Sequence, residues 1–116
     1  MSDLHPNFRL WIYSDTRKGV FGDGKARLLR EVGRTGSLRA ASGNLRISYR
    51  KAWGDIRKAE TCVGAKLAVR SRGGTAGGRT VLTPRCVALL EAYARFRAAA
   101  ERDVGKLFVK HMVPCL

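Results

Sequence analysis

The residues of this chain best suited to bind an anion lie in one short stretch, 48–53, with the sequence Ser-Tyr-Arg-Lys-Ala-Trp. A guanidinium can donate two hydrogen bonds to a base edge or a phosphate, and a lysine adds a compact cation. The stretch also begins an apolar pattern at the i, i+3, i+4, i+7 spacing of an amphipathic helix. That pattern consists of Tyr49, Ala52, Trp53 and Ile56. It predicts that Tyr49 and Trp53 face the core, while Arg50 and Lys51 face outward.

A second helix is predicted immediately before this one. Ser37 is a good N-cap for a helix through about Gly43, and Ser48 caps the next helix, which continues to about Cys62. Residues 44–47 form the turn between them. Two helices joined by a tight turn, the second with a basic start, make a helix-turn-helix. This motif puts the start of its second helix in the DNA major groove.

A glycine-rich segment follows the two helices. Two short apolar runs, 66–72 and 79–83, flank the sequence Gly-Gly-Thr-Ala-Gly-Gly at 73–78. This pattern predicts a β-hairpin with a long tip, which would be the wing of a winged helix. The segment lacks the Gly-Lys-Ser/Thr ending of a nucleotide-binding loop. A tip without fixed structure, with incidental arginines, remains the alternative.

The predicted DNA contacts come from both parts. Hydroxyls and helix-start N–H groups suit phosphates, the first turn of the second helix suits base edges, and wing arginines suit the backbone. Alternatively, these basic side chains only solvate an outer face. The predicted DNA-binding residues are Ser37, Ser48, Arg50, Lys51, Arg57, Arg70, Arg72 and Arg79.

A long final helix is predicted from Thr83-Pro84, with threonine as cap and proline in the first turn, to about Met112. At 1.5 Å per residue its length is roughly 40 Å, more than a small domain can cover. We therefore expect its apolar stripe to join two copies of the chain, although packing within one chain remains possible. The predicted dimerisation residues are Leu89, Leu90, Tyr93, Phe96, Val104 and Leu107.

The remaining elements complete a single domain over residues 1–116. Phe8 to Tyr13 is predicted as a strand, residues 15–23 as a loop or short hairpin, and Lys25 to Arg34 as a helix that ends at Gly36. The predicted fold class is mainly α with a small β component. It is a winged helix-turn-helix with an N-terminal strand, a helix-turn-helix at about 37–62, a wing at about 66–83 and a dimerisation helix at about 84–112.

The charge of the chain favours a nucleic-acid partner. Its 116 residues include 23 Lys and Arg against 9 acids, for a net charge of +14. Neutralising phosphates releases counterions, so this charge becomes affinity for duplex DNA. An anionic membrane surface or an acidic protein is the competing partner.

Catalysis, metals and cofactors are not expected. The three cysteines have no metal-ligand spacing, and no nucleophile–base pair can be assigned, so we predict a protein that is not an enzyme. No secretory signal or membrane-spanning run is present, and no small-molecule effector site is evident. We expect a cytoplasmic protein with reduced thiols and no membrane association.

Over roughly residues 8–95 the chain resembles the DNA-binding domain of the molybdate-responsive, ModE-type repressors. The resemblance rests on the strand ending at Tyr13, on Gly36-Ser37, on Ile47-Ser48-Tyr49 with Ala52-Trp53, and on Gly73-Gly74 and Gly77-Gly78 followed by Val81-Leu82-Thr83. The related domains of LysR-type regulators are similar in layout, but the glycine-rich wing fits the ModE type better.

This resemblance implies a homodimer that binds a palindromic operator, with recognition around Ser48, Arg50 and Lys51 and the wing around Arg70 to Arg79. Full-length members continue into a molybdate-binding module, whereas this sequence ends at Leu116. We therefore expect a sequence-specific transcriptional regulator that lacks the molybdate-sensing module. The alternative is a basic interaction module for acidic protein or anionic membrane surfaces.

Overall fold

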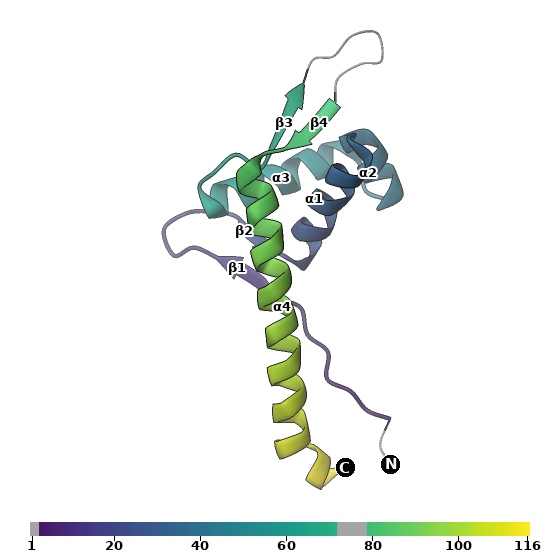
Figure 1. Ribbon diagram of the computed structural model, residues 1–116, viewed down its shortest axis with the longest axis vertical. Helices are drawn as coiled ribbons and strands as arrows, with labels where there is room; N and C mark the ends of the chain where they lie inside the picture. The colour runs from purple at the N-terminus through teal and green to yellow at the C-terminus, as the bar shows by residue number, and fades with distance from the viewer. Residues whose placement is uncertain (1–2, 72–78) are drawn as a thin grey trace.

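The chain folds into a small, mainly helical head from which one long helix projects (Figure 1). The computed structural model describes residues 3–71 and 79–116. The radius of gyration, 17.4 Å, exceeds the roughly 13 Å of a compact domain of this length. In chain order the elements are β1 (Trp11–Tyr13), β2 (Val20–Gly22), α1 (Asp23–Thr35), α2 (Leu38–Asn44), α3 (Tyr49–Val63), β3 (Ala68–Ser71), β4 (Arg79–Leu82), α4 (Pro84–His111) and the 3-10 turn η1 (Val113–Cys115). The predicted fold class is confirmed.

Three helices begin at the predicted caps. The backbone N–H of Ala40 donates to the Ser37 hydroxyl over 3.0 Å, and that of Lys51 donates to Ser48 over 2.9 Å. Thr83 caps α4 in the same way. Each hydroxyl satisfies one of the donors that a helix start leaves unpaired. Gly36 ends α1 in the left-handed conformation, at φ 70°, which a residue without Cβ adopts at no steric cost.

The core of the head lies where α1, α2 and α3 meet. Ala26, Leu28, Leu29 and Val32 of α1 are buried, and this helix begins two residues earlier than expected, at Asp23. Below it, β2 contributes Phe21, whose ring meets that of Tyr93 edge to face at 5.1 Å. Burying a large apolar side chain contributes about 1.5–3 kcal/mol. The largest side chains that are fully buried are Phe21, Leu28, Leu29, Val32, Leu38, Ile56, Leu67 and Cys86.

The N-terminal strand is shorter than predicted. Only Trp11–Tyr13 forms β1, and it pairs antiparallel with β2 in the register Trp11↔Gly22. Backbone groups of two preceding residues bond to side chains and not to β2. The Leu10 N–H donates to the Asp23 carboxylate, and the Phe8 carbonyl accepts from Arg97. The hairpin alternative for residues 15–23 is the correct one.

The wing strands form a hairpin that is attached to the end of α1. β3 and β4 pair antiparallel, with Ala68 opposite Leu82 and Ser71 opposite Arg79. Thr80 N–H donates to the Gly36 carbonyl over 3.0 Å, which ties β4 to the end of α1. The predicted hairpin tip at 73–78, and Arg72 beside it, lie outside the described residues.

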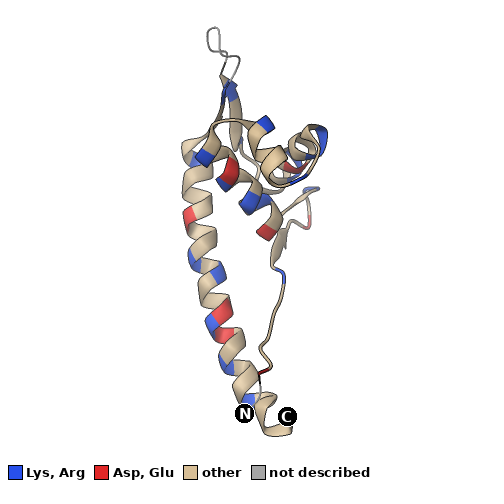
Figure 2. Cartoon of the chain, turned by 90° about the vertical axis from the view of Figure 1, so that its right-hand side faces the viewer, with Lys and Arg blue, Asp and Glu red and all other residues tan. Residues whose placement is uncertain are grey.

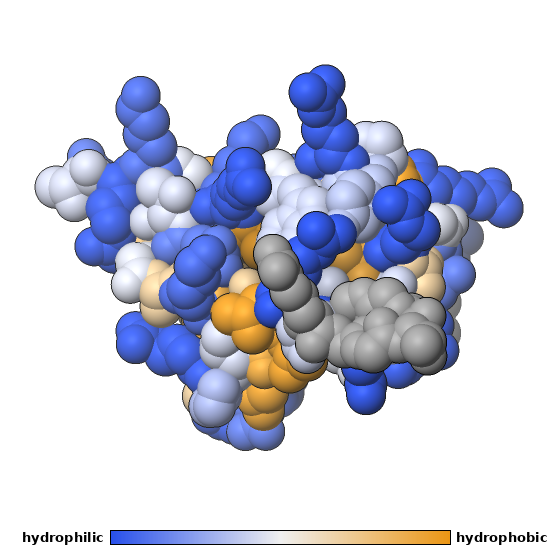
Figure 3. Space-filling model, turned by 90° about the horizontal axis from the view of Figure 1, so that it is seen from above, coloured by the Kyte–Doolittle hydropathy of each residue, from blue (hydrophilic) through white to orange (hydrophobic). Residues whose placement is uncertain are grey.

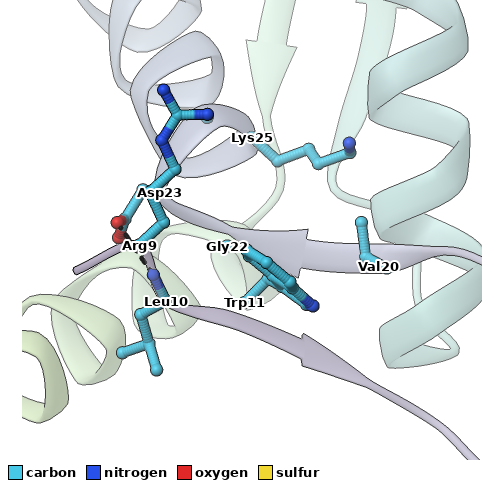
Figure 4. Close-up of a pocket in the computed structure, with 8 residues that line it drawn as sticks. Arg9, Leu10, Trp11, Val20, Gly22, Asp23 and Lys25 are labelled. Carbon is cyan, nitrogen blue, oxygen red and sulfur yellow. Dashed lines mark hydrogen bonds between the residues drawn. The ribbon is translucent and has the colours of Figure 1, made fainter.

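A polar junction fixes the N-terminal segment, α1 and α4 to one another. The Asp23 carboxylate accepts from Leu10 N–H at 3.1 Å, from the Tyr93 hydroxyl and from Arg97 Nε at 3.0 Å. Figure 4 shows the pocket beside this junction: a dashed line joins Asp23 to Leu10, and Lys25 extends away from them toward α3. The Asp23 carboxylate therefore attaches α4 to the head through its bonds to Tyr93 and Arg97.

Candidate nucleic-acid interface

The outer side of α3 carries the densest group of predicted DNA contacts. Ser48, Arg50, Lys51, Arg57 and Lys58 are all exposed, whereas Ala52 and Ile56 on the opposite side are fully buried. Figure 2 shows that Lys and Arg gather on the head and that α4 below it carries charges of both signs. Seen from the wing end, hydrophilic side chains project around most of the rim of the head (Figure 3). Amphipathicity therefore turns the basic face of α3 outward, as the sequence predicts.

Arg50 and Lys51 differ in their surroundings. Within the described ranges Arg50 has no acidic partner, so its guanidinium can meet a base edge or phosphate. Lys51 Nζ lies 3.1 Å from a carboxylate oxygen of Asp55, one turn further along α3. Lys25 of α1 approaches the same carboxylate at 3.9 Å. The Lys51 side chain is exposed, and an i,i+4 pair on a helix contributes only about 0.3–0.5 kcal/mol, so an anionic partner can displace it.

Arg57 lies further from the helix start than the other predicted contacts. It lines a groove between α3 and β3, together with Tyr49, Trp53, Lys66 and Arg70. Glu60 lines this groove as well, but its carboxylate accepts from the backbone N–H groups of residues 67 and 68. The groove therefore has a cationic rim, and the acid Glu60 is already hydrogen-bonded to the backbone.

The wing arginines take up separate positions. Arg70 of β3 reaches across to α3, where its guanidinium donates to the Tyr49 hydroxyl and its Cζ lies 5.8 Å from the Trp53 ring centroid. Arg79 of β4 is exposed, and its guanidinium lies beside Gly36 at the α1–α2 connection. Ser37 caps α2 at this connection, so Arg79 and Ser37 belong to one corner of the head.

Two further basic residues were missed from the sequence. Arg39 lies in the first turn of α2, with its Cζ 4.6 Å from the centroid of the Tyr49 ring. Arg46, in the α2–α3 turn, is exposed and has a left-handed backbone, with φ 58°. The net charge of +14 implied more basic residues than the predicted contacts include, but nothing local distinguished these two from other arginines.

Tyr49 and Trp53 are only partly buried, although the helical spacing assigns both to the core side. They pack against the edge of the core, while Ala52 and Ile56 fill its centre. The Tyr49 and Trp53 rings therefore lie between the core and the exposed basic residues of α3.

Two acids of the head, Glu31 and Asp23, accept hydrogen bonds from neighbouring donors. Hydrogen bonds from Arg34 and Asn44 lower the pKa of Glu31 to about 2. Burial would raise the pKa of Asp23, but hydrogen bonds from Tyr93 and Leu10 and the charge of Arg97 outweigh it, so that pKa is lowered. Both carboxylates stay ionised at neutral pH, where they hold helices together.

The predicted dimerisation residues divide into two groups. Leu90 and Tyr93 are buried on the head of their own chain, and Leu89 packs against the same core. Phe96 and Leu107 are 51% and 54% exposed, and Val104 is half-buried. All six share one face of α4 at 3.6 residues per turn. The head therefore covers the first part of the stripe and leaves the second part open.

The cysteines do not form a site in the part of the chain that the structure describes. Cys62 and Cys86 are buried and Cys115 is exposed, all with free thiols. Burial raises the pKa of the Cys86 thiol to about 11, so it stays protonated. Among residues 3–71 and 79–116 no group of His, Cys, Asp or Glu has the arrangement of a metal site. No helix there combines the length and the apolar character needed to cross a bilayer.

Comparison with known proteins gives a family match over most of the head. The model of the bacterial regulatory helix-turn-helix proteins of the lysR family matches residues 24–87. The matched range begins in α1 and ends in the first turn of α4. It thus includes the two helices, the turn and the wing described above.

Curated relatives and a solved structure are similar over the same region. The molybdenum-pterin-binding protein MopB of Rhodobacter capsulatus is 37% identical over 86 residues, which is 74% of this chain and 30% of MopB. The transcriptional regulator ModE of Haemophilus influenzae is 35% identical over 78 residues, 66% of this chain and 31% of ModE. ArgP of Mycobacterium tuberculosis shares the fold, with a TM-score of 0.54 at 21% identity over 73% of this chain and 30% of its own. The chain thus spans about 30% of the length of these relatives.

Proposed function

Because the chain belongs to the lysR family of bacterial regulatory helix-turn-helix proteins and its matched domain is of the ModE type, we propose that it is a sequence-specific DNA-binding transcriptional regulator. The observation that carries this proposal is the exposed basic side of α3, held by a buried apolar side against the core. A helix presented in this way can enter the major groove with its first turn toward the bases.

Six of the eight predicted contacts take a role from their position. Arg50 reads a base edge, because it lies in the first turn of α3 with no acid beside it among the described residues. Lys51, once released from Asp55, and Arg57 contact phosphates on either side of the groove. Ser37 and Ser48 cap helix starts that face the backbone, and Arg79 approaches it from the wing.

A homodimer and a palindromic operator form the second part of the proposal. The apolar stripe of α4 continues beyond the head through Phe96, Val104 and Leu107. A second copy of the same helix would cover this stripe and relate the two α3 helices by two-fold symmetry. The operator would then be an inverted repeat, with half-sites one DNA turn or a multiple of it apart.

Selection of duplex fragments from a random-sequence pool, followed by anisotropy titration, tests this function. We expect enrichment of an inverted repeat that binds more tightly than random duplex at moderate salt. Arg50→Ala should lower affinity for the enriched duplex by roughly 1–3 kcal/mol, with a much smaller effect on random duplex.

The matched control is Arg102→Ala, which removes the same charge from the projecting part of α4 and should change neither titration. Equal decreases on both duplexes for Arg50→Ala would make this residue a phosphate contact only. Failure to enrich any sequence, together with binding that disappears above about 0.2 M salt, would favour a basic interaction module for acidic partners instead.

A further inference from the structure

Tyr49 is the meeting point of three elements. It is the first residue of α3, and two arginines from other elements approach its side chain. Arg39 of α2 has its Cζ 4.6 Å from the ring centroid, and Arg70 of β3 has its Cζ 5.7 Å from it. The Arg70 guanidinium also donates to the Tyr49 hydroxyl. One tyrosine thus links the helix-turn-helix to the wing.

The two arginines lack anionic partners in the described part of the chain. The acids of the head bond to other groups: Asp55 pairs with lysines, and Glu60 accepts from the backbone at residues 67 and 68. Two guanidinium groups drawn to one ring repel each other. An anion between them would relieve this repulsion and could accept hydrogen bonds from both.

We propose that Tyr49 positions Arg39 and Arg70 as a phosphate clamp that spans the helix-turn-helix and the wing. This clamp rests on the DNA-binding function proposed above. Its ligand is a phosphodiester group of the DNA strand that lies beside α3. The aromatic face holds each guanidinium by a cation–π contact without neutralising it. The tyrosine hydroxyl fixes the direction of Arg70 through its hydrogen bond.

A salt titration of DNA binding tests the clamp. With random-sequence duplex, the slope of log K against log salt becomes shallower by about 0.9 for each phosphate that the protein no longer neutralises. Arg39→Ala and Arg70→Ala should each lower affinity on every duplex and make this slope shallower by about one. Arg102→Ala, on the projecting part of α4, should leave the slope unchanged.

Tyr49→Phe isolates the positioning role, because it keeps the ring and removes only the hydroxyl. We expect it to lower affinity about threefold, as for the removal of one hydrogen bond, and to have no further effect when Arg70 is already alanine. Tyr13→Phe is the matched control, since Tyr13 is 68% exposed on β1 and away from this junction. Arg70→Lys retains the charge, so it should retain the slope while lowering affinity.

The outcomes separate the clamp from the general function. If the unmodified chain does not bind duplex DNA, the proposed function fails. If it binds but Arg39→Ala keeps the wild-type slope, or Tyr49→Phe adds its full effect to Arg70→Ala, the clamp alone is overturned. Thermal unfolding of each variant identifies those that bind weakly because they no longer fold, in which case Tyr49→Phe and Arg70→Lys decide.

Discussion

At the scale of single residues, the basic surface consists of arginines whose environments differ. Arg50 is exposed without an acid nearby in the described chain, Arg57 lines the groove beside β3, and Arg70 is held by an aromatic pair. Arg46 is exposed on a strained backbone. The surroundings of an arginine therefore depend on its neighbours, and the different roles that we propose for these residues follow from that difference.

Replacing Arg46 by glycine should stabilise the fold and weaken DNA binding. At φ 58° the Cβ of a non-glycine residue is crowded, which costs about 1–2 kcal/mol. Glycine removes this strain but gains freedom in the unfolded chain, so we expect a net stabilisation of roughly 0.5–1 kcal/mol. Urea unfolding measures the stability, and anisotropy measures the affinity.

Arg46→Ala separates the two effects. Alanine removes the cation but keeps the crowded Cβ, so this variant should bind as weakly as Arg46→Gly without the increase in stability. A glycine variant that is less stable than the alanine variant would contradict the role of backbone strain. Unchanged affinity in both variants would remove Arg46 from the interface.

At the scale of elements, the Asp23 junction decides how α4 leaves the head. Asp23 begins α1, Tyr93 and Arg97 belong to α4, and Leu10 precedes β1. Burial, and next the hydrogen bond to Asp23, raise the pKa of Tyr93, so its hydroxyl remains a donor. One carboxylate thus fixes a helix whose other half extends far from the core.

The stability of the fold should depend on pH through Asp23. Its pKa in the folded chain is below the ordinary value of 3.8. Its contribution is therefore complete above that ordinary value and is lost as the pH falls through the folded pKa. Thermal unfolding from pH 7 down to pH 2 should show the melting temperature falling below about pH 4.

Asp23→Asn should be less stable at neutral pH and should be less sensitive to acidification. Glu31→Gln is the comparison, because the pKa of Glu31 is also lowered, to about 2, but its partners Arg34 and Asn44 lie on the exposed surface. Solvent screening should make its effect the smaller one. If the melting temperature of Asp23→Asn falls as steeply at low pH as that of the wild-type chain, other carboxylates cause most of the pH dependence.

At the scale of the whole molecule, the shape itself favours a second copy. The extents are 62 × 33 × 22 Å, and the long dimension is α4 extending below the head (Figure 1). The stripe that packs on the head through Leu90 and Tyr93 continues through Phe96 and Leu107, which are 51% and 54% exposed. Because exposed apolar area is costly in water, pairing of two α4 helices is the proposal that best fits this shape.

Leu107→Glu should therefore convert a dimer into a folded monomer. A charge in the paired stripe would be buried without a partner, whereas the head does not depend on Leu107 for its core. Sedimentation velocity at micromolar concentration measures the oligomeric state, and circular dichroism measures the fold. Val109→Glu is the matched control, because Val109 is 60% exposed and lies on the opposite face of the same turn of α4.

A wild-type chain that sediments as a monomer would contradict the dimer. A Leu107→Glu variant that stays dimeric while Val109→Glu dissociates would move the interface to the other face of α4. Weaker DNA binding by the monomeric variant, at unchanged fold, would link the dimer to the two half-sites of the proposed operator.

The sequence by itself determined the elements and the direction in which α3 presents its charges. A capping hydroxyl bonds to a backbone N–H three residues further on, as at Ser37, Ser48 and Thr83. Helical periodicity repeats every three to four residues. Both patterns are local, so both can be recognised from the sequence. The predicted bounds of α2, α3 and α4 differ from those of the structure by a residue or so. The motifs of the sequence also carried the resemblance to the ModE-type DNA-binding domain, which the family match and the curated relatives confirm.

Tertiary structure alone decided which contacts join distant residues. Arg70 reaches Tyr49 across 21 residues, Tyr93 reaches Leu10 across 83, and Arg97 reaches Phe8 across 89. These contacts explain why β1 is short and why Arg70 is bonded to Tyr49. They also explain why one part of the apolar stripe of α4 is covered and the other is open. Local propensity cannot predict them, because they depend on how four helices and two hairpins pack around one small core. The residues next to each position in the sequence do not determine that packing.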